Sequence, residues 1–195
     1  MYYLSNISSV VRIDPKNFGE KLKESILKQL KDSYEGNIEE TLGRVMNILS
    51  VNKISEGNII PGDGGIYYKT DFTAINYKPE IQEIVEGEVK DIAKFGIFVE
   101  IGPFEGLIHI SQAMDEYVSI NKQGVLQGKD SKRVLKVGDK IRARIIAVSF
   151  KDPTNPKIGL TMRQPYLGKL EWLEEEREKA KKEEKKEAKK TEKKK

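Results

Sequence analysis

The sequence predicts two folded domains, an α+β domain at the N-terminus and an all-β barrel after it, followed by a charged tail. Three observations lead to this prediction. Apolar residues recur every four positions between residues 18 and 34, which is the period of one face of a helix. Short β-rich runs punctuated by glycine fill residues 83–161. Residues 174–195 consist almost entirely of Lys and Glu and carry no apolar stripe.

Composition supports folded domains and excludes several kinds of site. The chain has 195 residues, of which 37% are hydrophobic, enough to bury a core in each of two domains. It has no cysteine, which excludes disulfides, zinc ribbons and iron–sulfur clusters, and its single histidine, His109, excludes a multi-histidine metal site. No long apolar run and no signal-peptide pattern occur, so we expect a cytoplasmic protein without a membrane partner.

The formal net charge of +4 is concentrated at the C-terminus. Residues 174–195 hold eleven Lys or Arg and eight Glu, so residues 1–173 carry 24 basic and 23 acidic side chains. Any attraction of the folded part for a polyanion must therefore come from a local patch.

The first domain, residues 1–79, begins with a strand-like stretch from Tyr2 to Ile13. Asp14 followed by Pro15 then predicts the start of a helix, which Gly36 is placed to end. The expected apolar face of this helix consists of Phe18, Leu22, Ile26, Leu30 and Tyr34.

The rest of the first domain reads as a small antiparallel sheet. Residues 43–52 predict a strand covered on both sides, because both of its faces are partly apolar, and a turn is expected at residues 56–58. The run from Pro61 to Gly65, three of whose five residues are glycine, predicts a tight loop with positive φ angles. Residues 66–77 read as a long strand, and Lys78-Pro79 marks the domain boundary.

The second domain, residues 80–165, contains five candidate strands. These are residues 83–93, 97–101, 106–109, 140–150 and 157–161. Five strands with this spacing predict a small Greek-key barrel of the OB type. Residues 115–133 are too long for a hairpin loop, so we expect them to be partly helical or mobile. An apolar extension, residues 166–173, follows, and the tail from residue 174 is expected to be a frayed helix or disordered.

One motif in the second domain is informative about function. The run from Val85 to Ser111, VEGEVKDIAKFGIFVEIGPFEGLIHIS, has Phe95-Gly96 at a tight turn, Phe98 two residues later and a Gly-Leu-Ile-His sequence ending at His109. This pattern resembles the S1 RNA-binding domain. On an OB barrel the second and third strands form the exposed binding face, where aromatic rings stack on bases of any sequence.

Basic residues near the fourth strand add candidate phosphate contacts. Arg142 and Arg144 alternate with apolar residues, so both leave the core on one face. Residues 129–144, here called the basic run, carry seven basic and two acidic side chains. The complete set of predicted RNA-binding residues is Phe95, Phe98, His109, Lys129, Lys132, Arg133, Lys136, Lys140, Arg142 and Arg144.

Each candidate also has a purely structural explanation. Barrel strands point alternate residues inward, so Phe95 or Phe98 could belong to the core. His109 could simply be satisfied by a backbone carbonyl, and the basic run could be a solvated loop. By turn chemistry alone, the glycines at 62, 64 and 65 could serve only a hairpin turn.

The sequences flanking the S1 motif narrow the family. The first domain carries Tyr34-Glu35-Gly36, Gly62-Asp63-Gly64 and Tyr77-Lys78-Pro79, and the barrel is followed by LTMRQPYLGKLEW at residues 160–172. Together these segments resemble the E-prime stalk family of archaeal DNA-directed RNA polymerase, the counterpart of the seventh subunit of eukaryotic polymerase II. The resemblance covers residues 1–173 and leaves the tail out.

This resemblance implies a truncated RNP-like first domain that docks on the polymerase core and an S1 domain that faces emerging RNA. It implies a heterodimer with the smaller helical F subunit of the polymerase, and help with open-complex formation and processivity. The loop Gly62, Asp63, Gly64 and Gly65 would contact the core, and Tyr166, Leu167, Leu170 and Trp172 would contact the F subunit. We expect no catalytic residue, metal or cofactor on this chain. The alternative is an S1-domain accessory protein of RNA decay or translation.

Overall fold

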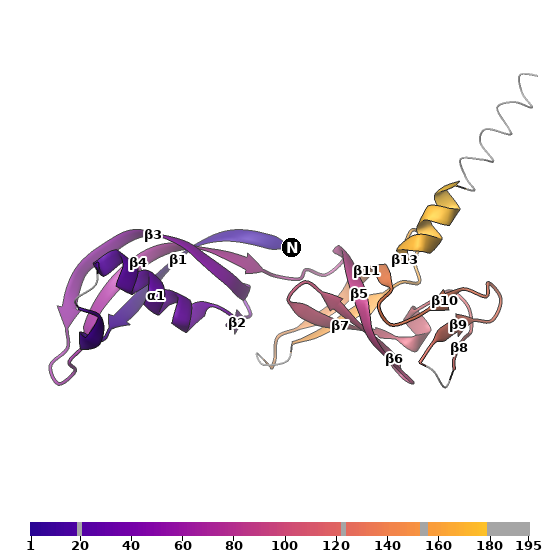
Figure 1. The fold of residues 1–195 in the computed structure, drawn as a ribbon, viewed down its shortest axis with the longest axis horizontal. Coiled ribbons are helices and arrows are strands. Elements are labelled where there is room, and N and C mark those ends of the chain that lie inside the picture. Colours follow the sequence, from indigo (N-terminus) through magenta and orange to yellow (C-terminus); the bar gives the residue numbers. More distant parts are fainter. Residues whose placement is uncertain (19–20, 122–123, 153–155, 179–195) are drawn as a thin grey trace, which may run out of the picture. The chain divides into compact units, whose positions relative to one another are not determined.

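The computed structural model describes residues 1–18, 21–121, 124–152 and 156–178 (Figure 1). The chain divides into two compact units, one made of Met1–Glu80 and the described residues of 150–156, the other of the described residues of 81–149 and 157–195. In the first unit one helix packs on an antiparallel sheet, and in the second a sheet closes into a five-stranded barrel. The predicted fold class is confirmed.

The first unit contains a four-stranded sheet with the order β1-β4-β3-β2. Its elements are β1 (Tyr2–Ile13), the 3₁₀ turn η1 (Pro15–Asn17), α1 (Leu22–Tyr34), β2 (Ile38–Glu39), β3 (Gly43–Ile59) and β4 (Ile66–Tyr77). Strand β1 pairs with β4 over twelve residues without a register shift. Because β1 is the end strand of the sheet, its other edge has no strand beside it among the described residues.

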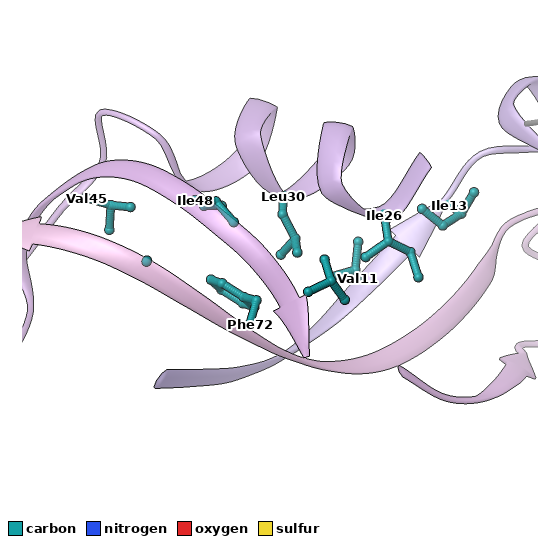
Figure 2. Close-up of a cluster of buried hydrophobic side chains, with 9 residues drawn as sticks. Val11, Ile13, Ile26, Leu30, Val45, Ile48 and Phe72 are labelled. Carbon is teal, nitrogen blue, oxygen red and sulfur yellow. The ribbon is translucent and has the colours of Figure 1, made fainter. Parts of the chain in front are cut away.

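Helix α1 supplies one wall of the core of this unit. Ile26 and Leu30 are completely buried, and they face Phe72 of β4, which is also completely buried (Figure 2). The same cluster includes Val11, Ile13, Val45, Ile48, Val51 and Ala74 from the three long strands. Burying each large aliphatic side chain contributes about 1.5–3 kcal/mol, so this layer accounts for the docking of the helix on the sheet.

The helix begins later than the sequence predicts. After Pro15 the chain makes only a single 3₁₀ turn, and α1 starts at Leu22. Asp14 gives no side-chain cap and instead pairs with Arg12. Phe18 therefore lies outside the helix with 48% of its surface exposed, whereas the end of α1 before Gly36 is as predicted.

Two expectations for β3 are wrong. The strand is covered on one face only, because Met46 and Leu49 are exposed while residues 45, 48 and 51 are buried. Four register shifts against β4 insert extra residues, which turns the usual alternation into a spacing of three. No turn occurs at residues 56–58, since Gly57 continues the ladder opposite Tyr68.

The second unit contains the barrel. Its strands are β5 (Ile84–Ala93), β6 (Gly96–Ile101), β7 (Phe104–His109), β11 (Lys140–Ser149) and β12 (Lys157–Thr161). They pair around the barrel in the order β5-β6-β7-β12-β11 and back to β5, with only the β7–β12 pair parallel. This is the strand order of an OB fold, and the five predicted strands are confirmed within a few residues.

The segment between β7 and β11 is neither helical nor featureless among its described residues. After the 3₁₀ turn η2 (Ile110–Gln112) it forms a separate three-stranded sheet, here called the inserted sheet, of β8 (Val118–Ile120), β9 (Leu126–Gly128) and β10 (Val134–Leu135). Leu126 and Leu135 are completely buried and anchor this sheet. Its strands of two or three residues are too short to show a sequence periodicity.

The chain after the barrel folds back onto the second unit. Strand β13 (Gly168–Lys169) pairs with β11, and residues 170–178 are helical. Trp172 and Leu173 are buried, and residues 179–195 of the tail, which include most of the predicted Lys/Glu run, lie outside the described residues. Within the described part of the chain, no helix is long and apolar enough to cross a membrane.

Candidate nucleic-acid interface

An aromatic cluster of Phe95, Phe98 and His109 forms on β6, on the turn before it and at the end of β7. Ile97 and Val99 are completely buried, so the alternation of β6 directs Phe98 out of the barrel, where it is half-buried. Phe95 lies in the β5–β6 turn with 55% of its surface exposed. The two rings meet edge to face, with centroids 5.8 Å apart. Neither phenylalanine belongs to the barrel core.

His109 completes this cluster from the neighbouring strand. It lies opposite Gly96 in the β6–β7 ladder, and its ring is exposed. Its Nδ1 accepts a hydrogen bond from the backbone N–H of Ser111 and lies 2.8 Å from the Ser111 hydroxyl oxygen. Among the described residues, the ring is therefore held in place by Ser111 and not by a backbone carbonyl oxygen.

The arginines of β11 are not neighbours of the aromatic cluster. In the barrel, β5 lies between β6 and β11, and its outward-facing Glu86 and Glu88 stand opposite Arg142 and Lys140. The guanidinium of Arg142 donates to Glu86 at 2.7 and 3.1 Å. We expected both arginines to be open to phosphates; the barrel topology instead places Glu86 beside Arg142.

Arg144 is also restricted. It is only partly exposed, and its Nε is buried without a hydrogen-bond partner among the described residues. Its neighbours in the two adjacent strands are Ile84 and Thr161. The alternation of β11 is as predicted, but it directs this side chain against the barrel surface and not freely into solvent.

The remaining basic candidates are spread over the inserted sheet and its connections. Lys132 and Lys136 are exposed. The Nζ of Lys129 lies 5.9 Å from the ring centroid of Tyr117, an exposed aromatic residue that the sequence analysis missed. Arg133 lies over the ring of Trp172 at 5.4 Å and pairs with Glu176 at 2.5 Å, so it serves to hold the C-terminal helix.

In the first unit, residues 61–65, here called the glycine loop, connect β3 to β4. Only Gly62 has a positive φ angle, +92°, so the prediction of positive φ angles holds for one glycine of three. Asp63 accepts from Arg12 at 2.6 and 2.9 Å, from the Tyr67 hydroxyl at 2.6 Å and from the Gly65 N–H at 3.0 Å. Ile59 and Ile60, just before the loop, are exposed. A fixed loop therefore lies beside apolar surface.

The four predicted partner contacts near the C-terminus differ in exposure. Tyr166 is 77% exposed and has a positive φ of 64°. Trp172 is buried within the chain itself, and Leu167 and Leu170 are half-buried. Of this set, Tyr166 alone presents most of its side chain to solvent. Among the described residues, no three His, Asp or Glu side chains gather in a way that could hold a metal ion.

Two family models match the two units. The S1 RNA binding domain matches residues 78–153, and the SHS2 domain found in the N terminus of Rpb7p/Rpc25p/MJ0397 matches residues 8–64. The matched S1 region contains the whole aromatic cluster.

Curated relatives cover nearly the whole chain. DNA-directed RNA polymerase subunit Rpo7 of Saccharolobus shibatae is 46% identical over 175 residues, which is 89% of this chain and 97% of the relative. The same subunit of Sulfolobus acidocaldarius is 39% identical over 183 residues, covering 93% and 100%. DNA-directed RNA polymerase III subunit RPC8 of Saccharomyces cerevisiae is 30% identical over 164 residues, covering 80% and 77%. The chain belongs to the Rpo7 family of DNA-directed RNA polymerase subunits.

Proposed function

We propose that this chain is the non-catalytic stalk subunit of a cytoplasmic archaeal RNA polymerase. It pairs with the F subunit, docks on the polymerase core through residues 1–79, and binds nascent single-stranded RNA through the S1 barrel of residues 80–165. In this role it assists open-complex formation and processivity. Membership of the Rpo7 family supports the assignment to a polymerase. The match to the S1 RNA binding domain supports RNA binding, and the aromatic cluster is the observation of the structure that carries it.

The geometry of the aromatic cluster suits single-stranded RNA of any sequence. Phe98 and His109 face outward from adjacent strands, and Phe95 meets Phe98 edge to face. Every base has a π face, and stacking on an aromatic ring is worth about 1–3 kcal/mol per base. Because the rings lie on the outer surface of the barrel, we infer stacking without strong sequence preference.

We expect the exposed basic residues to contact the phosphates. The exposed Lys132 and Lys136 are the first candidates. Arg142 would have to exchange Glu86 for a phosphate. This exchange leaves the Glu86 carboxylate without its partner, so Arg142 contributes less to the free energy of RNA binding. If about four phosphates are contacted, the logarithm of the binding constant should fall against the logarithm of salt concentration with a slope near −3.

The glycine loop and its surroundings support docking on the polymerase core. Its backbone is fixed by Asp63 before any partner arrives, so docking costs little conformational entropy in the loop. The adjoining Ile59 is 72% exposed, and apolar side chains of this kind are stabilised when a partner covers them.

Surfaces in both units support a tightly bound partner. The sheet face opposite α1 exposes Leu4, Met46 and Leu49, and the edge of β1 away from β4 offers backbone groups for pairing. In the second unit, Tyr166 projects from a strained backbone conformation. We propose that the F subunit covers these surfaces.

Affinity purification of the tagged full chain from its host tests the proposal. We expect polymerase core subunits and one small helical protein to be recovered together with it. Recovery of exosome or ribosomal components without polymerase would instead support the accessory-protein alternative and contradict a stalk role.

A further inference from the structure

A hollow of about 610 Å³ adjoins the aromatic cluster on the surface of the second unit. It is lined by Ile110 and Ser111, the residues that follow His109 directly, and also by Tyr117 and Asp130. Two residues that line the hollow contact residues of the cluster: the Ile110 N–H donates to the Phe95 carbonyl oxygen at 3.1 Å, and the Ser111 hydroxyl oxygen lies 2.8 Å from His109 Nδ1. A chain of bases leaving the cluster on this side would therefore meet the hollow next.

Tyr117 stands at the rim of this hollow with 83% of its surface exposed, more than any other large hydrophobic residue in the described part of the chain. Its position is fixed nevertheless. The backbone N–H of Lys129 donates to the Tyr117 carbonyl oxygen at 2.9 Å. The preceding residue, Glu116, accepts hydrogen bonds from the backbone N–H groups of Asp130 and Ser131 at 2.6 and 2.9 Å. Three consecutive backbone N–H groups, those of residues 129–131, therefore hold the backbone that carries the ring.

The charges around the hollow favour a base over a phosphate. Asp115, Glu116 and Asp130 line it together with one cation, Arg163, so the excess of negative charge repels a phosphate inside. Two of these carboxylates already have partners: Asp115 pairs with Arg163 at 2.7 Å, and Glu116 holds the inserted sheet. Lys129, which lies over the Tyr117 ring, offers a positive charge at the rim, where a sugar–phosphate backbone would pass.

We propose that Tyr117, the residue directly before β8 of the inserted sheet, is a second stacking platform for single-stranded RNA beyond the aromatic cluster, with Lys129 contacting the adjacent phosphate. This inference rests on the proposed RNA binding by the S1 barrel and extends it. The platform takes bases only from RNA long enough to pass the cluster first. The inserted sheet thus lengthens the RNA site of the barrel.

Filter binding with two single-stranded RNA lengths tests the platform. Oligonucleotides of about four and about sixteen nucleotides span the range of site sizes for one OB fold. For the full chain with Tyr117→Ala, we expect the affinity for the long RNA to fall about five- to 150-fold, while the affinity for the short RNA is unchanged. Tyr117→Phe, the matched control, keeps the ring and should bind both RNAs as wild type does.

Phe98→Ala makes the possible failures distinguishable. If Phe98→Ala weakens both RNAs and Tyr117→Ala weakens neither, the platform is overturned and RNA binding by the barrel stands. If the wild-type chain binds neither RNA, the proposed function fails as well. If Tyr117→Ala and Tyr117→Phe lose the same affinity, the ring is not the contact and the proposal is overturned.

A fluorescence measurement shows contact directly. The chain has one tryptophan, Trp172, and only 9% of it is exposed. In Tyr117→Trp the new indole lies on the rim, and we expect the long RNA to quench its emission on binding, with the wild-type titration as background. Unchanged emission at saturating RNA would overturn the proposal, because a stacked base must alter the surroundings of the ring.

Discussion

Asp63 determines the conformation of the glycine loop. Its carboxylate accepts hydrogen bonds from Arg12 first, and also from the Tyr67 hydroxyl and the Gly65 N–H. These donors hold the pKa of Asp63 well below its usual range, and the same contacts raise the pKa of Arg12 and of Tyr67. One acidic side chain thus joins the end of β1, the loop and the start of β4.

The depressed pKa of Asp63 predicts an acid-dependent contribution to stability. Because the folded-state pKa lies below the unfolded value of about 3.9, this contribution is complete above that value and is lost as the pH falls through the folded-state pKa. We expect Asp63→Asn to be less stable than wild type at neutral pH, with the difference shrinking below about pH 4. Urea unfolding across the acidic to neutral range measures it; a difference that does not change with pH would contradict the role of the charge.

Two glycines of the loop differ in what they tolerate. Gly62 has a φ of +92°, which costs a β-branched residue on the order of 1–3 kcal/mol, whereas the φ of Gly64 is not positive and its nearest neighbour is Pro15 Cγ at 3.6 Å. We expect Gly62→Val to weaken recovery of the polymerase core and Gly64→Val to weaken it less. RNA binding should be the same in both variants. If both recover the core equally, the positive φ angle of Gly62 is not what makes this position important for docking.

Gly65 carries a different constraint, the close approach of Arg12. A Cβ at this position would lie 2.8 Å from Arg12 Nε, so any side chain pushes the guanidinium away from Asp63. The sequence shows a glycine at position 65, but it does not show that Arg12 approaches this position closely and leaves no room for a side chain. This long-range contact explains why turn chemistry alone predicts a loop without predicting how it is held.

The barrel strands could be predicted from the sequence because each is a short β-rich run with a glycine within it or near one of its ends. The buried face of β3 could not be predicted, since four register shifts against β4 replace the usual alternation of buried and exposed residues. The start of α1 could not be predicted either, because Asp14 forms an ion pair with Arg12 and does not cap a helix. The aromatic cluster follows from local alternation, whereas the separation of Arg142 from it depends on strand order, which a sequence pattern does not carry.

The helix of residues 170–178 contacts one side chain that directly precedes β10 of the inserted sheet. Arg133 pairs with Glu176 and covers the ring of Trp172. We expect Arg133→Met to loosen this helix by about 1 kcal/mol or less, as is usual for exposed pairs, and to shift the Trp172 emission to longer wavelength. Lys132→Met, which removes the same charge one residue away, is the control and should leave the emission unchanged. An unshifted spectrum in Arg133→Met would show that the helix is held by apolar contacts alone.

The two units divide the proposed functions between them. The first carries the glycine loop and an open sheet face, and the second carries the aromatic cluster and the inserted sheet. Their cores are distinct: the cluster around Phe72 draws all its buried members from the first unit, while the only tryptophan of the chain lies in the second. Polymerase docking and RNA binding should therefore be separable by mutation.

Leu30→Ala tests this separation. Leu30 is completely buried under α1, so its truncation should destabilise the first unit by about 2–5 kcal/mol. In a urea titration, we expect the first transition in the far-ultraviolet circular dichroism to occur at a lower urea concentration than in wild type. The transition in Trp172 emission, which reports the second unit, should stay where it is in wild type. The affinity for RNA, measured without urea, should also be unchanged. Ile145→Val, a smaller truncation in the barrel core, should move the emission transition instead. If Leu30→Ala shifts both transitions equally, the units unfold as one, and the division of functions between separate cores is wrong.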